Sequence, residues 1–191
     1  MNPYVIGAFI NECRIRWRSI EGFSDAVDYI KSVEPGVVVT KDIISAPTNV
    51  CDEVAKLLQR PGRLLTLLNV GDWLLLIRGL YDFNGELIDP EPNLDMPNLV
   101  LNIKVPSRSL GLVIRVVLKF LDIGSSVFSS DDGRTYVVVH DRDSIARFIK
   151  TIKPHLDPEQ NIVLKNKWAK HYAPYGNPII LLHNANRYQA V

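Results

Sequence analysis

Two segments of the chain alternate between apolar and polar side chains, which is the pattern of a β-strand with one covered face. They are residues 14–18 and residues 99–105. Their polar faces carry Arg14, Arg16 and Arg18 in the first segment and Asn102 and Lys104 in the second. Residues 36–40 and 43–45 are rich in β-branched side chains and predict two short strands joined by a turn at residues 41–42.

Apolar residues at helical spacing predict helices over residues 24–33, 49–59, 73–82, 109–121, 143–152 and 161–170. On the helix over residues 109–121, the positions predicted to face the core are Leu112, Val113, Val116, Val117 and Phe120. Trp73 and Phe148 are predicted core residues of their own helices. Residues 125–140 predict a hairpin about a turn at residues 131–134. Residues 84–98 contain three prolines and four acids without a base, and they predict a loop.

The predicted elements repeat in order along the chain. Residues 3–60 and residues 72–156 each give helix, strand, helix, hairpin and helix, which favours an internal duplication. We therefore expect an α/β (α+β) fold with a first repeat over residues 1–68, a second over residues 69–157 and a C-terminal extension over residues 158–191.

Composition and charge narrow the class of protein. The chain has 191 residues with 47% hydrophobic and 23% charged, typical of a globular protein. No apolar run is long enough to span a membrane, and the N-terminus lacks the pattern of a signal peptide. Two cysteines are too few for a disulfide scaffold, which predicts an intracellular protein with reduced thiols.

The net charge of +1 is unevenly distributed. The first hundred residues carry 9 Lys and Arg against 14 Asp and Glu, whereas the remainder carry 13 against 7. The basic half is compatible with a polyanionic partner but does not by itself establish one. The four histidines lack zinc-site spacing, and no phosphate-binding glycine motif is present.

The segment Leu-Ile-Arg-Gly-Leu-Tyr-Asp-Phe-Asn-Gly-Glu at residues 76–86 resembles the signature helix of LAGLIDADG homing endonucleases. A weaker first motif lies at residues 4–13, and the resemblance is to two-motif, single-chain members of the archaeal, intron-encoded type. It implies two pseudo-symmetric αββαββα repeats that form a saddle of two antiparallel sheets. It also implies a monomer with an internal pseudo-twofold, double-stranded DNA as the partner, and Mg²⁺ held by the last acid of each signature helix.

Only one of the two metal-binding acids that the resemblance implies is present in this sequence. Glu12 occupies the catalytic-acid position of the first motif, and Asn84 occupies the corresponding position of the second. An amide supplies a neutral oxygen where a hard divalent ion prefers a carboxylate, so we expect cleavage to be impaired or lost. Arg142 lies where the resemblance places a basic residue close to the active site, and Asp82 holds the family's other acidic position, which is associated with the helix end.

The nucleic-acid-binding residues implied by the resemblance are Arg14, Arg16, Arg18, Lys41, Asn102, Lys104, Arg134, Tyr136 and His140. Lys165, Lys167, Lys170 and Trp168 form a further basic segment. Four acids at residues 84–98 argue against a conventional phosphate-binding surface there. Three alternatives therefore stay open: an active site-specific DNA endonuclease, an RNA-binding maturase-like splicing factor, and a protein-interaction module on the same fold.

Overall fold

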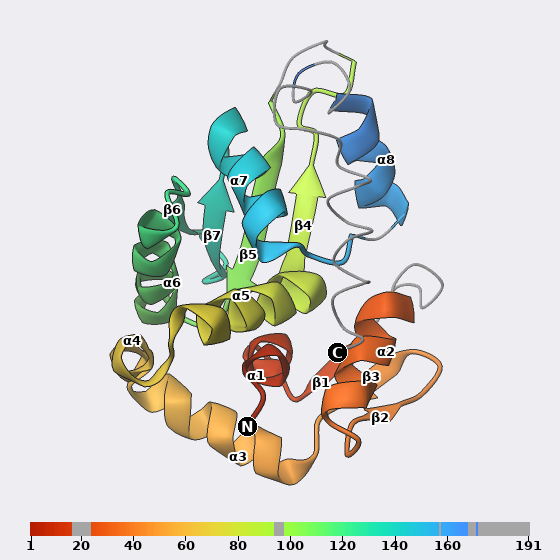
Figure 1. Cartoon of the computed structure of the whole chain (residues 1–191), viewed down its shortest axis with the longest axis vertical. Helices are drawn as coiled ribbons and strands as arrows, with labels where there is room; N and C mark the ends of the chain where they lie inside the picture. Colours follow the sequence, from red (N-terminus) through yellow and green to blue (C-terminus); the bar gives the residue numbers. More distant parts are fainter. Residues whose placement is uncertain (17–23, 94–97, 157, 168–170, 172–191) are drawn as a thin grey trace.

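The computed structural model describes residues 1–16, 24–93, 98–156, 158–167 and 171 (Figure 1). In the first part of the chain the elements are α1 (Pro3–Phe9), β1 (Arg14–Arg16), α2 (Ser24–Val33), β2 (Val38–Val39), β3 (Ile43–Ser45) and α3 (Thr48–Gln59). A 3-10 turn η1 (Pro61–Arg63) and α4 (Leu64–Leu67) follow. The second part contains α5 (Val70–Asn84), β4 (Gly85–Ile88), β5 (Val100–Val105), α6 (Arg108–Phe120), β6 (Ser126–Ser129), β7 (Thr135–Val139), α7 (Arg142–Ile152) and α8 (Pro158–Lys167).

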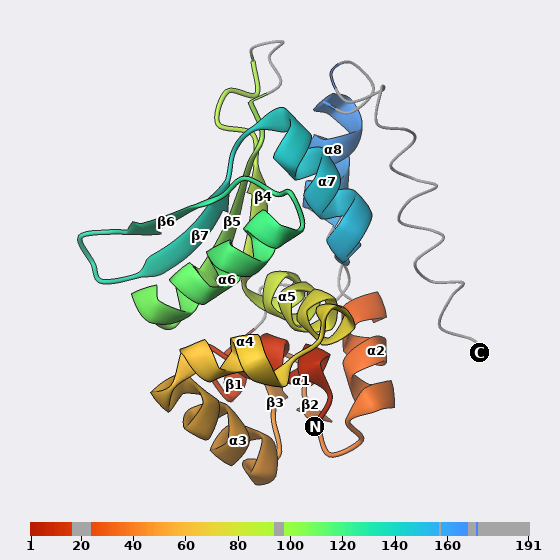
Figure 2. The ribbon, with the colours of Figure 1, turned by 60° about the vertical axis from the view of Figure 1, so that its left-hand side comes forward.

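The strands form two antiparallel sheets, as the sequence predicts. One sheet has the order β1-β3-β2, and the other has the order β4-β5-β7-β6. Helices α6 and α7 lie along one face of the four-stranded sheet (Figures 1 and 2). The second part therefore has the predicted αββαββα order, whereas the described residues of the first part supply one strand fewer.

Helices α1 and α5 pack against each other at the centre of the molecule, between the two sheets (Figure 1). A methyl group on Gly7 would overlap the carbonyl oxygen of Leu76, and one on Gly79 would overlap the carbonyl oxygen of Tyr4. The two glycines thus allow the helix backbones to touch at reciprocal positions. This reciprocity defines a pseudo-twofold relation that equates Gly7 with Gly79 and Glu12 with Asn84.

The helix predicted over residues 73–82 begins earlier and ends later, at Val70 and Asn84. Its start is fixed by a capping box in which the Asn69 side chain accepts from the backbone N–H of Asp72 and the Asp72 side chain accepts from that of Asn69. The sequence pattern predicts the start of this helix only at Trp73, because its N-cap residues are also common in turns.

The set of α6 residues predicted to face the core is partly wrong. Val113 and Val117 are buried as predicted, but Phe120 is 85% exposed, and Leu112 and Val116 are also exposed. The positions that reach the core alongside the two valines are Leu110, Ile114 and Leu118. The helix carries apolar residues around more than one face, so periodicity alone did not identify the face that meets the sheet. Trp73 and Phe148 are buried, as predicted.

The prediction that residues 84–98 form a loop is wrong for its first part. Residues Gly85–Ile88 form β4, an edge strand that pairs with β5 from Gly85 opposite Ile103 to Ile88 opposite Val100. Leu87 is buried in the core, which is the apolar contact that makes this acidic segment a strand. Helix α8 packs near β4, and a salt bridge of 3.1 Å joins Lys167 Nζ to Asp89 Oδ2.

The expectation of two reduced thiols is also wrong for this structure, in which Cys13 and Cys51 form a disulfide with their Cα atoms 5.8 Å apart. Cys13 follows α1 and Cys51 lies in the first turn of α3, so the packing of these helices brings together two residues whose spacing gives no sign of pairing. None of the helices in the described ranges is both long and apolar enough to cross a membrane.

Candidate nucleic-acid interface

The ends of the two central helices carry the predicted metal-binding positions. Asn84 is the last residue of α5 and is partly buried, and its amide Nδ2 donates to the carbonyl oxygen of Ala8 in α1 at 3.2 Å. Glu12 follows α1 with an exposed side chain. Its neighbour Asn11 donates from Nδ2 to the carbonyl oxygen of Lys104 at 2.9 Å, which ties the end of α1 to the end of β5.

This pair does not fit a two-metal site. The Asn84 amide is used to join the two helices, and it contributes no negative charge. Across the described ranges, no three His, Cys, Asp or Glu side chains gather closely enough to hold a metal ion. Mg²⁺ is held through carboxylate and other hard oxygen ligands, and here the helix ends supply one carboxylate.

Asp82, the other acidic position of the second motif, is the centre of a buried polar network. Its carboxylate accepts from the Tyr4 hydroxyl at 2.6 Å, from the His155 backbone N–H at 2.8 Å and from His155 Nδ1 at 2.6 Å. The guanidinium of Arg78 donates to His155 Nε2 at 2.9 Å. Because Nε2 accepts, the network assigns the ring proton to Nδ1, where it is donated to Asp82.

The network joins the two halves of the molecule. Tyr4 comes from α1, Arg78 and Asp82 from α5, and His155 from the segment after α7. Arg78 also lies 5.7 Å from the centre of the Tyr29 ring, on α2. Burial and, secondarily, the negative charge of Asp82 raise the pKa of Tyr4 well above its usual value. The sequence pointed to Asp82 and places Arg78 one helical turn before it in the same motif, but it gave no signal for the contacts with Tyr4 and His155, which lie 78 and 73 residues away.

The three-stranded sheet presents two of the predicted arginines. Arg14 and Arg16 are exposed on β1, on either side of buried Ile15, so the alternation predicted for this segment is confirmed in its described part. Lys41 is exposed in the turn between β2 and β3. Arg18 and Trp17 lie outside the described residues.

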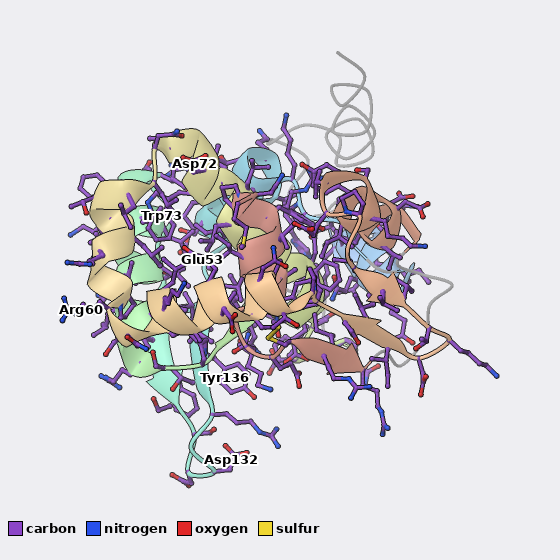
Figure 3. The ribbon with its side chains drawn as sticks, turned by 90° about the horizontal axis from the view of Figure 1, so that it is seen from below. Glu53, Arg60, Asp72, Trp73, Asp132 and Tyr136 are labelled. Carbon is purple, nitrogen blue, oxygen red and sulfur yellow. A yellow bond between two sulfur atoms is a disulfide. The ribbon has the colours of Figure 1, made fainter. Side chains whose placement is uncertain are left out.

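The four-stranded sheet turns one face toward α6 and α7, and no helix of the described residues lies on its other face, which we call the open face (Figures 1 and 2). Residues of β5 and β7 alternate between the two faces. Asn102 and Lys104 lie together on the open face, as the alternation predicts, and Tyr136 lies on the same face. Lys104 is directly opposite Tyr136 in the strand register. Arg134 lies just before β7 and forms a salt bridge of 3.0 Å with Asp132 in the hairpin turn (Figure 3).

His140 and Arg142 lie beyond the other end of β7. Both are exposed, and Arg142 begins α7, where its Nε is 3.5 Å from an oxygen of Asp143. They follow Val139, which pairs with Leu101 near the start of β5, whereas Asn11 contacts Lys104 near the end of β5. The structure therefore does not bring Arg142 beside Glu12 and Asn84, and a role for it at the helix ends stays a prediction.

The corresponding edge strands β1 and β4 differ in charge. The relation that equates Gly7 with Gly79 also equates Arg14 with Glu86 and Arg16 with Ile88. The edge strand of one sheet is thus basic, and that of the other is acidic and apolar. Lys167, from the basic C-terminal segment, is buried against Asp89, while Lys170 and Trp168 lie outside the described residues.

Comparison with known proteins supports the fold. No protein-family model matches the chain, and no curated protein is similar enough in sequence to match. Among solved structures, I-DmoI in complex with DNA and Mn has a TM-score of 0.50 and 17% identity, over 79% of this chain and 94% of that one. The N-terminal LAGLIDADG domain of DUF199/WhiA has a TM-score of 0.52 and 12% identity, over 84% and 87%. Full-length DUF199/WhiA from Thermatoga maritima has a TM-score of 0.52 and 13% identity, over 99% and 68%.

The comparisons agree with the mixed arrangement of helices and two antiparallel sheets described above. At this level of identity the agreement concerns the fold alone. The chain has the LAGLIDADG homing-endonuclease fold.

Proposed function

We propose that this chain binds double-stranded DNA across the open faces of its two sheets and does not cleave it by a two-metal route. The observation that carries the binding proposal is the exposed pair Arg14 and Arg16 on β1, with Lys41 in the neighbouring turn. Guanidinium groups along a strand can contact phosphates and guanine edges. Support comes from I-DmoI, a protein of the same fold whose structure was solved in complex with DNA.

The loss of cleavage follows from Asn84. Two-metal phosphodiester cleavage uses anionic ligands to hold the ions that stabilise the attacking and leaving oxygens. I-DmoI was solved in complex with DNA and Mn and in complex with DNA and Ca, so divalent ions accompany the fold in that protein. In the present chain the corresponding pair is one exposed carboxylate and one amide that holds the two helices together.

Binding is tested by fluorescence anisotropy on duplexes selected from a random library, with affinity measured across a range of salt concentrations. Each phosphate contact contributes roughly 0.9 to the slope of log affinity against log salt. We expect the double variant Arg14→Gln/Arg16→Gln to weaken binding and to lower that slope by about 2. The matched control is Arg115→Gln/Lys119→Gln, which removes two exposed cations from α6. Equal losses in both variants would contradict a site on β1, and a salt-independent affinity would contradict DNA binding.

Cleavage is tested on the selected duplexes with Mg²⁺ or Mn²⁺. We expect no double-strand product from the natural chain. The variant Asn84→Asp restores the second carboxylate and is expected to produce metal-dependent nicks or breaks, whereas the control Asn84→Ala is not. Double-strand products from the natural chain that disappear in Glu12→Ala would show that the enzyme is active and would refute this part of the proposal. Competition with structured RNA at fixed salt tests the maturase-like alternative.

A further inference from the structure

The open face of the four-stranded sheet carries two aromatic side chains in direct register. Phe128 on β6 is opposite Tyr136 on β7, and Tyr136 is in turn opposite Lys104 on β5. Residues opposite each other on one face of an antiparallel pair have Cβ atoms about 5 Å apart, so these three side chains form a continuous row. We call Lys104, Tyr136 and Phe128 the aromatic row.

The aromatic row faces away from the core. Val127, the neighbour of Phe128, lies close to Gly111 of α6, so Val127 points toward the helices and Phe128 points to the opposite face. Thr135 and Val137 flank Tyr136 and are buried. Phe128 is 57% exposed. The strands that carry both rings extend outward as a hairpin, with Tyr136 along it and Asp132 at its tip (Figures 2 and 3).

Positive charge lies at the same end of the sheet. Lys104 is exposed, and the end of β5 on which it lies is tied to α1 by Asn11, next to Glu12. Arg134 lies two residues before Tyr136 along the chain, and its guanidinium is paired with Asp132 in the hairpin turn, which partly neutralises it. The acid on this face, Glu86, is in the neighbouring row, opposite Asn102.

A row of rings with a cation suits unpaired bases better than a duplex. In double-stranded DNA the base faces are stacked on each other, and a protein in the groove reaches only base edges and phosphates. Phe128 has no hydrogen-bonding group to read an edge. In a single strand the faces are available, and stacking on an aromatic side chain contributes about 1–3 kcal/mol per base. Four-stranded sheets that display aromatic residues are a known platform for stacking two or three unpaired nucleotides.

We propose that the aromatic row is a stacking site for unpaired bases, so that this sheet binds single-stranded or locally opened nucleic acid. The inference deepens the proposed function and rests on it. The arginine-bearing sheet supplies phosphate contacts to a duplex, and the aromatic row holds bases that have left it. A duplex with a single-stranded extension is therefore the nucleic-acid class that uses both faces.

The experiment compares three fluorescein-labelled probes at fixed salt: a single strand of oligo-dT, a duplex, and that duplex with an oligo-dT extension. The variants are Phe128→Ala, Tyr136→Ala and the control Phe120→Ala, which removes an 85% exposed phenylalanine from α6 on the helical side. Phe128→Ala and Tyr136→Ala are each expected to weaken oligo-dT binding by about tenfold to a hundredfold. In Phe128→Ala the extended duplex should lose its advantage over the blunt duplex while blunt-duplex affinity stays unchanged, and Phe120→Ala should leave the affinity for all three probes unchanged.

The outcomes separate the two proposals. Unchanged oligo-dT affinity in both aromatic variants, with duplex binding intact, would overturn the stacking site and leave the proposed function standing. Absence of binding to all three probes would overturn both. A fall in sedimentation mass from dimer to monomer in Phe128→Ala would show that a second copy of the chain covers the row, and it would also overturn the inference. Rescue of oligo-dT binding by Phe128→Trp would support stacking over a merely structural effect.

Discussion

Removal of the Asp82 carboxylate is predicted to destabilise the protein severely. Asp82 is 2% exposed, and its carboxylate accepts three hydrogen bonds, from the Tyr4 hydroxyl and from two nitrogens of His155. Asp82→Ala would leave those donors buried without an acceptor and would leave Arg78 without the nearby negative charge, 4.0 Å away. Each unsatisfied buried donor costs about 1–3 kcal/mol. Breaking a buried charged network costs about 3–5 kcal/mol, which we take as the expected loss because some donors will find water.

A loss of this size is a large part of the roughly 5–15 kcal/mol that stabilises a domain. The measurement is urea unfolding followed by circular dichroism, with Asp52→Ala on the exposed surface of α3 as the control that should change stability by less than about 0.5 kcal/mol. If Asp82→Ala does not fold, Asp82→Asn keeps an acceptor for the His155 backbone and should show a smaller loss. A loss below about 1 kcal/mol in Asp82→Ala would refute the view that this network holds the two halves together.

Three further outcomes follow from the same structure. Gly79→Ala forces a methyl group into the facing helix backbone and should lower the free energy of unfolding, measured in urea, by about 1–3 kcal/mol or more. The control Gly62→Ala places its methyl group in open space and should leave that free energy unchanged. Burial raises the pKa of Tyr4 in the folded chain above its usual value of 10.0. The stability that this shift contributes is complete below pH 10.0 and is lost as the pH rises above it, because only the unfolded chain then releases the proton. In alkaline thermal melts, the stability of Tyr4→Phe should therefore decline less steeply with pH than that of the natural chain. Cys51→Ser, or reductant added to the natural chain, should lower the free energy of unfolding by about 4 kcal/mol, because the disulfide closes a loop with a sequence separation of 38. If Cys51→Ser has the same urea midpoint as the natural chain in non-reducing buffer, the disulfide is contradicted.

The sequence by itself determined the elements whose signals are local. Alternation at residues 14–16 and 100–105 and helical spacing in α3, α5 and α7 predicted elements that the structure confirms. The motif at residues 76–86 identified the central helix α5, and Gly79 of this motif is where the backbones of α1 and α5 come into contact. These predictions succeeded because backbone periodicity and close helix contact depend on residue type at fixed spacing.

Only the tertiary structure decided which surface each element buries and which distant side chains meet. Periodicity could not choose the face of α6, since Leu112 and Leu110 are equally apolar and only the sheet distinguishes them. The acidic segment around Glu86 forms a strand because it pairs with β5 and because Leu87 is buried in the core. The contacts of Asp82 with Tyr4 and His155 span 78 and 73 residues, and a sequence carries no local signal for pairs that form only when the chain closes on itself.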